Sequence, residues 1–232
     1  LIYSSPRIFE RRRRILEEAR RLLSECGYER FGIRELCLRA QVAPQTVYKA
    51  FENKERLIAL AIRHHFETAE DQYEFTLPKD TLDGVMERII VVDNNTTAAR
   101  EYSSALVTIY FSQTAQQDLQ AAARFHIVGT LEPWASALRE RGHLRRGFSP
   151  ERLVNSITHL VFGAALEWSR GSISNDEFLL QRVLAVLLCG AGATRGSAQK
   201  EISVYLTDAL GKRTFFDDIR RRSREGQKAL AS

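Results

Sequence analysis

The stretch from Ala40 to Leu57, A-Q-V-A-P-Q-T-V-Y-K-A-F-E-N-K-E-R-L, decides how the rest of the chain is interpreted. It predicts a tight turn at Gln41-Val42, a short helix from Pro44 to about Ala50, and a further helix that starts near Lys54. Proline fits the first turn of a helix, where its missing N–H would have no partner. A helix of this length is too short to be a core element, so its side chains are expected to serve a partner.

The short helix has one packing face and one free face. Val47 and Phe51, four residues apart, form the side that packs on the domain, whereas Gln45, Thr46 and Lys49 point elsewhere. Glutamine can bond adenine edges, threonine can meet a phosphate or a thymine methyl group, and lysine can meet a phosphate or guanine. The stretch therefore predicts a helix–turn–helix that places its second helix in the major groove of double-stranded DNA.

Two neighbouring residues are candidates for phosphate contacts. The ring of Tyr48 can pack while its hydroxyl reaches a phosphate, and Lys54 lies where free backbone N–H groups at a helix start also favour a phosphate. A structural interpretation stays open for each of them. Tyr48 is then a core residue and Lys54 a solvated lysine.

Charge is unevenly distributed along the chain. Residues 1–63 hold 14 Lys and Arg against 8 Asp and Glu, a net charge of +6, whereas residues 64–199 hold 12 against 16, a net charge of −4. A basic head on an acidic body is expected when only the head meets nucleic acid. The run Arg11–Arg14 lies in this head, as a solvated helix face or as a DNA-contacting arm.

The flanking sequence completes a small helical domain, which we place at residues 1–60. A helix with an apolar stripe is predicted from Pro6 to Cys26, and Gly27 is expected to end it by adopting a left-handed backbone conformation. A second helix covers Ile33 to Arg39, and the helix from Lys54 runs well past His65.

This arrangement resembles the tetracycline-repressor (TetR) family of regulators over about Ile15 to Leu60. The family motifs appear as Gly27-Tyr28, then Phe31 to Cys37, then Ala40-Gln41-Val42-Ala43, and finally Tyr48, Phe51, Lys54-Glu55 and Leu57. The resemblance implies an all-α fold, in which a three-helix helix–turn–helix domain precedes a larger helical domain for ligand binding and dimerisation.

The resemblance also implies roles for single residues. Thr46, Tyr48 and Lys54 would hold phosphates, Arg34 would reach a base or a phosphate, and Gln45 and Lys49 would read bases.

Three positions depart from the family pattern. Phe31-Gly32 replaces a hydroxyl pair, Gln41 replaces the glycine of the turn, and Ala43 replaces a capping serine. We therefore expect missing helix caps and a left-handed glutamine, which has a cost in conformational energy.

The remainder of the chain is also predicted to be helical. We expect helices at about Thr81–Thr97, Arg100–Thr114, Gln117–Arg141, Ser149–Gly171 and Ser174–Gly190. Ser149 and the pair Ser174 and Glu177 are predicted caps, and Gly129 and Pro133 should bend the long helix. Gly190, Gly192 and Gly196 are predicted to break the chain before helical segments at Lys200–Leu210 and Arg213–Leu230. We divide this part into an effector-binding and dimerisation domain at residues 61–195 and a C-terminal extension at residues 196–232.

The two helices between Ser149 and Gly190 carry more apolar surface than one protomer needs. A lone helix–turn–helix reads only a few base pairs, so two copies about one helical turn apart are expected to read a palindrome. In the resembling family the last two body helices form a four-helix bundle with the partner. We therefore predict a homodimer; burial within one protomer is the other interpretation.

The resemblance adds a ligand pocket in the body. Near the kinked helix, the candidate lining groups are aromatic or polar: Tyr110, Phe111, Phe125, His126, Trp134, His159 and Trp168. Such a lining would suit a bulky, partly apolar effector that releases the repressor from DNA, and ordinary core packing is the other interpretation of each residue.

The alternative function is a DNA-binding protein of the same fold, without a small-molecule ligand, controlled by a protein partner or by DNA alone. In either case the basic tail around Arg220–Arg224 is interpreted as a solvated helix rather than a second DNA contact.

Other functional classes are not supported. Glu140 and His143 form a single E-x-x-H, whereas a di-iron bundle needs two such motifs and two further glutamates. The sequence has neither a phosphate-cradling glycine loop nor a G-x-S-x-G elbow, so we predict no enzyme, no cofactor and no metal site. The longest apolar run has eleven residues, Val183 to Ala193, too few to span a bilayer. Three scattered cysteines are expected to be reduced, and the chain cytoplasmic.

Overall fold

Helices follow one another along the chain in the computed structural model, which describes residues 6–211 and 214–230. They are α1 (Pro6–Cys26), α2 (Ile33–Arg39), α3 (Pro44–Phe51), α4 (Lys54–Glu70), α5 (Leu82–Val91), α6 (Asp93–Ala98), α7 (Arg100–Phe111), α8 (Gln117–Glu140), α9 (Pro150–Ser169), α10 (Asn175–Ala193), α11 (Gly196–Gly211) and α12 (Phe215–Leu230). The described ranges contain no β-strand, only an isolated bridge between Leu144 and Thr194. The predicted all-α fold is confirmed.

The chain divides into two units, each with its own hydrophobic core. Unit 1 contains the residues up to Gln72 together with Ala99–His126, and unit 2 contains Tyr73–Ala98 and the residues from Ile127 onward. Helix α8 contributes to both. The functional division that we placed at residues 60 and 195 stays a prediction, since these structural units follow packing rather than function.

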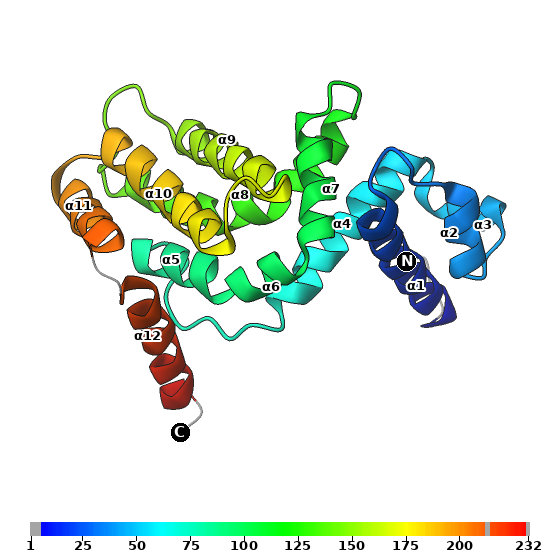
Figure 1. Cartoon of the computed structure of the whole chain (residues 1–232), viewed down its shortest axis with the longest axis horizontal. Coiled ribbons are helices and arrows are strands. Elements are labelled where there is room, and N and C mark those ends of the chain that lie inside the picture. The colour runs from blue at the N-terminus through cyan, green and yellow to red at the C-terminus, as the bar shows by residue number, and fades with distance from the viewer. Residues whose placement is uncertain (1–5, 212–213, 231–232) are drawn as a thin grey trace. The chain divides into compact units, whose positions relative to one another are not determined.

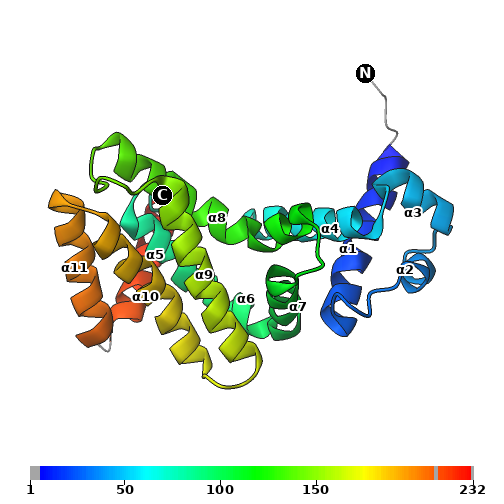
Figure 2. The same ribbon diagram turned by 90° about the horizontal axis from the view of Figure 1, so that it is seen from above.

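Unit 1 is built around α1. Its residues Ile15, Leu16, Ala19, Leu22 and Leu23 are buried, as the apolar stripe predicted. They pack with α2, α3, α4 and α7 in one core cluster, and Figures 1 and 2 show α2 and α3 joined on one side of α1. The predicted stop at Gly27 is confirmed by a φ of 72°.

Unit 2 is built around a pair of adjacent helices, α9 and α10 (Figure 1). The two predicted serine caps are confirmed, because the hydroxyl of Ser149 accepts from the N–H of Arg152 and that of Ser174 from the N–H of Glu177. The return bond of a capping box, from the N–H of Ser174 to the carboxylate of Glu177, stays a prediction. Both tryptophans of the chain, Trp134 and Trp168, are buried here.

Three predicted boundaries in the body were wrong. The helix expected at Thr81–Thr97 is interrupted at Val92, next to Asp93, whose carboxylate pairs with the buried Arg182 at 3.1 Å. The next helix ends at Phe111 rather than Thr114, since Ser112 leaves the helical conformation with a ψ of 130° and its hydroxyl accepts from the N–H of Ala115.

The third error concerns the glycines that were expected to break the chain after residue 190. Gly190 and Gly192 lie inside α10, and only Gly196, with a φ of 66°, starts a new helix. A Cβ atom at Gly190 would lie 3.2 Å from the ring of Trp134 and 3.1 Å from the side chain of Ile202. Gly190 therefore allows close packing in unit 2 and does not act as a break.

The C-terminal extension is fixed to unit 2. The buried carboxylate of Glu87 on α5 accepts hydrogen bonds from Thr76, Leu77 and the hydroxyl of Ser223 on α12. Three of the four arginines of α12 pair with acids: Arg220 with Asp217, Arg221 with Asp218 and Arg222 with Asp83. These ion pairs neutralise much of the basic face and fit the solvated interpretation of the tail.

None of the helices in the described ranges combines the length and apolarity that crossing a bilayer requires. All three cysteines are free thiols, with Cys37 buried and Cys26 and Cys189 half-buried. Burial raises the pKa of the Cys37 and Cys189 thiols.

Aromatic contacts hold α4 against the rest of unit 1. The imidazole of His65 meets the ring of Tyr102 on α7 edge-on at 5.0 Å, and Phe66 stacks on His126 of α8 at 4.9 Å. The guanidinium of Arg20 on α1 lies 5.7 Å from the centroid of the Tyr102 ring. Because α4 follows α3 directly, these contacts fix the helix on which α2 and α3 are supported.

The surroundings of His65 disfavour its protonated form. Burial lowers its pKa from 6.5 to about 4, and the nearby charges of Arg20, His126 and His64 act in the same direction. A histidine with a depressed folded-state pKa takes up its proton more readily in the unfolded chain. Its contribution to stability is therefore complete above about pH 6.5 and is lost progressively as the pH falls toward 4.

We expect the wild type to lose stability between pH 7.5 and pH 5, and a His65→Leu variant to lose clearly less, since it has no proton to gain at this position. Urea unfolding followed by circular dichroism measures the difference. His159→Leu, which replaces an exposed histidine on α9, is the control for losing an imidazole elsewhere in the chain. Equal losses in the wild type and His65→Leu would show that His65 is not the titrating group.

Candidate nucleic-acid interface

Helix α3 is attached to unit 1 along one face only. Val47 and Phe51 are each 1% exposed and lie in the unit 1 core, as the spacing predicted. The N-cap position is Ala43, which provides no side-chain cap, and Pro44 follows at the start of the helix. An eight-residue helix without a side-chain cap depends on tertiary contacts for its stability and direction.

The predicted DNA-contacting residues lie on the opposite side. Gln45, Lys49 and Tyr48 on α3 are exposed, Thr46 is half-buried, and Arg34 is exposed on the preceding helix, α2. Tyr48 is 51% exposed, which excludes the interpretation that it is a core residue. A polar surface with a tyrosine and cations thus projects from the helix–turn–helix.

Both ends of α3 are defined by unusual backbone conformations. Gln41 in the preceding turn has a φ of 51°, so the predicted left-handed glutamine is confirmed, and Glu52 after the helix has a φ of 66°. Such conformations are uncommon for residues with a Cβ atom. The chain then enters α4 through Asn53, whose side chain accepts from the N–H of Arg56 at 2.8 Å. Gly32, at the start of α2, provides no side-chain cap, as its departure from the family pattern predicted.

Lys54 is more constrained than the sequence suggested. Its ammonium donates to the carbonyl oxygen of Tyr28 at 3.3 Å and lies 5.0 Å and 5.8 Å from the ring centroids of Tyr28 and Phe31. An ammonium has three N–H donors, so the bond to Tyr28 leaves donors for a phosphate. Burial, with a smaller effect of Glu55, raises the pKa of the Tyr28 hydroxyl, which therefore stays protonated.

One residue of this surface escaped the sequence analysis. Arg12 on α1 donates through its guanidinium to the carbonyl oxygen of Ala50 at 3.2 Å and lies 4.6 Å above the Phe51 ring. We had considered it only as part of the run Arg11–Arg14. Its position on the same helical face as Ile15 and Ala19 was the available signal, because an arginine in an apolar stripe is expected to meet a neighbouring element.

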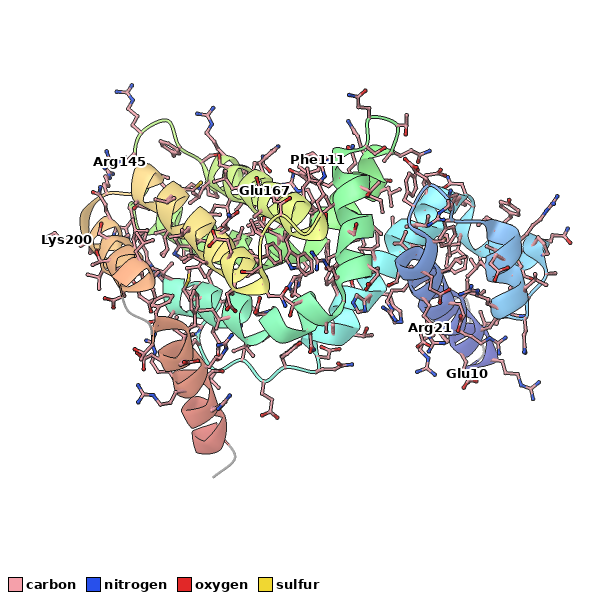
Figure 3. The ribbon with its side chains drawn as sticks, viewed as in Figure 1. Glu10, Arg21, Phe111, Arg145, Glu167 and Lys200 are labelled. Carbon is pink, nitrogen blue, oxygen red and sulfur yellow. The ribbon has the colours of Figure 1, made fainter. Side chains whose placement is uncertain are left out.

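The predicted ligand-pocket residues are divided between the two units. In unit 1, Tyr110 is half-buried and touches Phe111 ring to ring at 5.1 Å. Phe111, at the end of α7 (Figure 3), is 49% exposed, and Phe125 lies under the guanidinium of Arg63 at 5.6 Å. His126 stacks on Phe66, as described above.

The other three candidates lie in unit 2. Trp134 is buried against Gly190, and Trp168 stacks on Phe178 while its indole N–H donates to Asn175 at 2.8 Å. His159 is exposed on α9. Their role in ligand binding stays a prediction. The described residues contain no group of three or more His, Cys, Asp or Glu side chains that could hold a metal ion.

Comparison with known proteins agrees with this geometry. Residues 15–61 match the family model described as bacterial regulatory proteins, tetR family. The chain is 30% identical over 188 residues to the HTH-type transcriptional repressor KstR of Rhodococcus jostii (strain RHA1), an alignment that covers 80% of this chain and 86% of the relative.

Solved structures share the fold at lower identity. TylP, a tetR regulator from Streptomyces fradiae, has a TM-score of 0.58 at 15% identity and covers 90% of this chain and 98% of its own. FadR of Thermus thermophilus, solved in complex with lauroyl-CoA, has a TM-score of 0.51 at 20% identity, with 80% and 97% covered. Family model, relative and fold agree with the resemblance seen in the helix–turn–helix motif. The chain belongs to the tetR family of bacterial regulatory proteins.

Proposed function

We propose that this protein is a DNA-binding transcriptional repressor that binds a palindromic operator as a dimer, acts in the cytoplasm and is released by a small, partly apolar effector. The observation that carries the DNA-binding part is the two-sided character of α3. Its apolar residues are buried in unit 1, while Gln45, Tyr48 and Lys49 are exposed. The name of the relative KstR, a transcriptional repressor, supports the sign of regulation.

Exposure and chemistry suggest a division of roles on this surface. Gln45 and Lys49 have the donors and acceptors to read base edges. Thr46, Tyr48 and Lys54 are suited to phosphates, which fix the position of the helix without carrying sequence information. Arg34 on α2 is exposed and adds a cation for a phosphate or a base.

We expect Gln45→Ala to lower affinity for a duplex selected by the wild-type protein by roughly tenfold, and to relax the preference at one base pair of each half-site. Tyr48→Phe should weaken binding to the selected duplex and to a scrambled duplex by similar factors, because it removes a phosphate contact. Gel-shift titrations at one salt concentration measure both.

Lys200→Ala is the matched control, since Lys200 is an exposed cation on α11 of unit 2 (Figure 3). It should leave both affinities unchanged. The proposal that α3 reads bases is wrong if Gln45→Ala binds the selected duplex as tightly as Lys200→Ala does.

We place the dimerisation surface on the exposed sides of α9 and α10. Leu160 on α9 is 51% exposed and Leu188 on α10 is 54% exposed, whereas Leu180 and Leu184 on α10 are half-buried. Exposed leucines on two adjacent helices form an apolar patch that a second copy can cover by a two-fold axis. Such a dimer supplies the two reading heads that a palindrome requires.

Leu188→Glu should convert the dimer to a monomer at micromolar concentration, because a charge would be buried at the centre of the contact. Light scattering coupled to size exclusion measures the mass. Val204→Glu places the same charge at a 60% exposed apolar position on α11 and should leave the dimer intact. A wild-type protein that is monomeric under these conditions would rule out this proposal.

Two observations support effector binding: the exposed aromatic side chains of unit 1 and the ligand of a structural neighbour. FadR of Thermus thermophilus was crystallised with lauroyl-CoA, a molecule with a long apolar chain. Half-exposed aromatic side chains such as Phe111 and Phe125 can contact such a chain.

We expect an acyl thioester such as lauroyl-CoA, or another partly apolar compound in a screening panel, to raise the thermal midpoint and to weaken binding to the selected duplex. A ligand at 100 times its Kd stabilises by about 2.7 kcal/mol, which a thermal-shift assay detects readily. Fluorescence of Trp134 and Trp168 provides a second signal from unit 2. If no compound changes either signal, control by a protein partner or by DNA alone is the better account.

A further inference from the structure

The recognition helix α3 is held at its C-terminal end. Its two buried residues are Val47 and Phe51, and the backbone N–H of Glu52 closes the last turn on the carbonyl oxygen of Tyr48. Ala43 supplies no side-chain cap at the other end. The end of α3 that carries Gln45 therefore takes its direction from contacts near residues 47–52 and from the preceding turn, where Val42 packs on the unit 1 core.

Arg12 makes two of these contacts with one guanidinium. It donates to the carbonyl oxygen of Ala50 at 3.2 Å and lies 4.6 Å above the Phe51 ring. A cation near the last carbonyl groups of a helix also interacts favourably with the helix dipole. The planar group thus connects the N-terminal half of α1 to the last turn of α3.

We propose that Arg12 is a positioning residue, which fixes the angle at which α3 enters the major groove and so determines sequence discrimination without contacting a base. This inference rests on the proposed DNA-binding function and adds a role for a residue of the arginine run.

The length of α3 explains why such an anchor affects base reading. Five residues separate Ala50 from Gln45, about 7.5 Å along a helix. A tilt of 10–20° about the anchored end would displace Gln45 by roughly 1–3 Å, more than a hydrogen bond to a base edge tolerates. Phosphate contacts through flexible lysine side chains adapt to such a shift more easily.

A direct phosphate contact by Arg12 is the competing explanation, and it has a different signature. A cation that neutralises a phosphate contributes about 0.9 to the slope of log affinity against log salt, and its loss weakens all duplexes alike. A positioning residue leaves the salt slope unchanged, and its loss reduces the ratio of specific to non-specific affinity.

The chain offers a charge-matched control on the next residue. Arg13 lies on the exposed side of α1, 3.8 Å from Glu17, with 62% of its side chain exposed. Arg12→Ala and Arg13→Ala remove the same charge at adjacent positions. Arg12→Lys keeps the charge but loses the planar group that serves the carbonyl and the ring together.

The test compares wild type, Arg12→Ala, Arg12→Lys and Arg13→Ala on the duplex selected by the wild type and on a scrambled duplex, over a range of salt concentrations. We expect Arg12→Ala to lose about tenfold on the selected duplex relative to Arg13→Ala, the equivalent of one charge-assisted hydrogen bond. On the scrambled duplex the two variants should agree within about twofold, with equal salt slopes. Arg12→Lys should fall between wild type and Arg12→Ala.

Amide hydrogen exchange of the free protein gives a readout that needs no DNA. Residues 45–52 should exchange faster in Arg12→Ala than in Arg13→Ala, while α4 keeps its protection, because only α3 loses an anchor.

Two results would overturn the proposal. One is an equal loss on both duplexes with a reduced salt slope in Arg12→Ala, which would identify a direct phosphate contact. The other is an Arg12→Ala variant that matches Arg13→Ala in discrimination and exchange. If the wild type selects no duplex, the proposed function itself fails, and the exchange comparison still decides whether Arg12 anchors α3.

Discussion

Burial of Val47 and Phe51 in the core of unit 1 is the constraint on which the rest of the structure depends. These two side chains are four residues apart, so they fix one face of α3 and leave the other in solvent. A helix of eight residues has little stability of its own. On the proposed function, base reading by α3 therefore depends on how firmly unit 1 holds this one helix.

The contacts that hold α3 come from parts of unit 1 that are distant in sequence. Arg12 on α1 reaches the last turn of α3, and Lys54 at the start of α4 bonds the carbonyl oxygen of Tyr28. Helix α4 is held in turn against α7 by the ring contact between His65 and Tyr102. Arg12 and Lys54, two cations of the basic head, thus bond groups inside the fold. Net charge alone does not separate such structural cations from those that are available to DNA.

Local sequence signals predicted the helix–turn–helix well because its elements are specified by neighbouring residues. The limits of α1, the left-handed Gln41 and the uncapped Ala43 all follow from residue types at fixed spacings. One error is local, since the hydroxyl of Ser112 ends α7 early by accepting from the N–H of Ala115. The other two lie where a distant contact overrides the local pattern. Gly190 stays helical because Trp134 packs against it, and the helix expected to continue through Val92 is interrupted next to the buried pair of Asp93 and Arg182. The role of Arg12 was missed for the same reason, since its partners are 38 or more residues away along the chain.

The central claim is that α3 enters the major groove at two equivalent places. Dimethyl sulfate footprinting of the selected duplex tests it directly, because this reagent methylates guanine N7 in the major groove and adenine N3 in the minor groove. The account predicts protected guanine N7 positions in two symmetric half-sites, separated by one turn of the double helix or a multiple of it. Protection of adenine N3 alone, or of a single half-site, would contradict it.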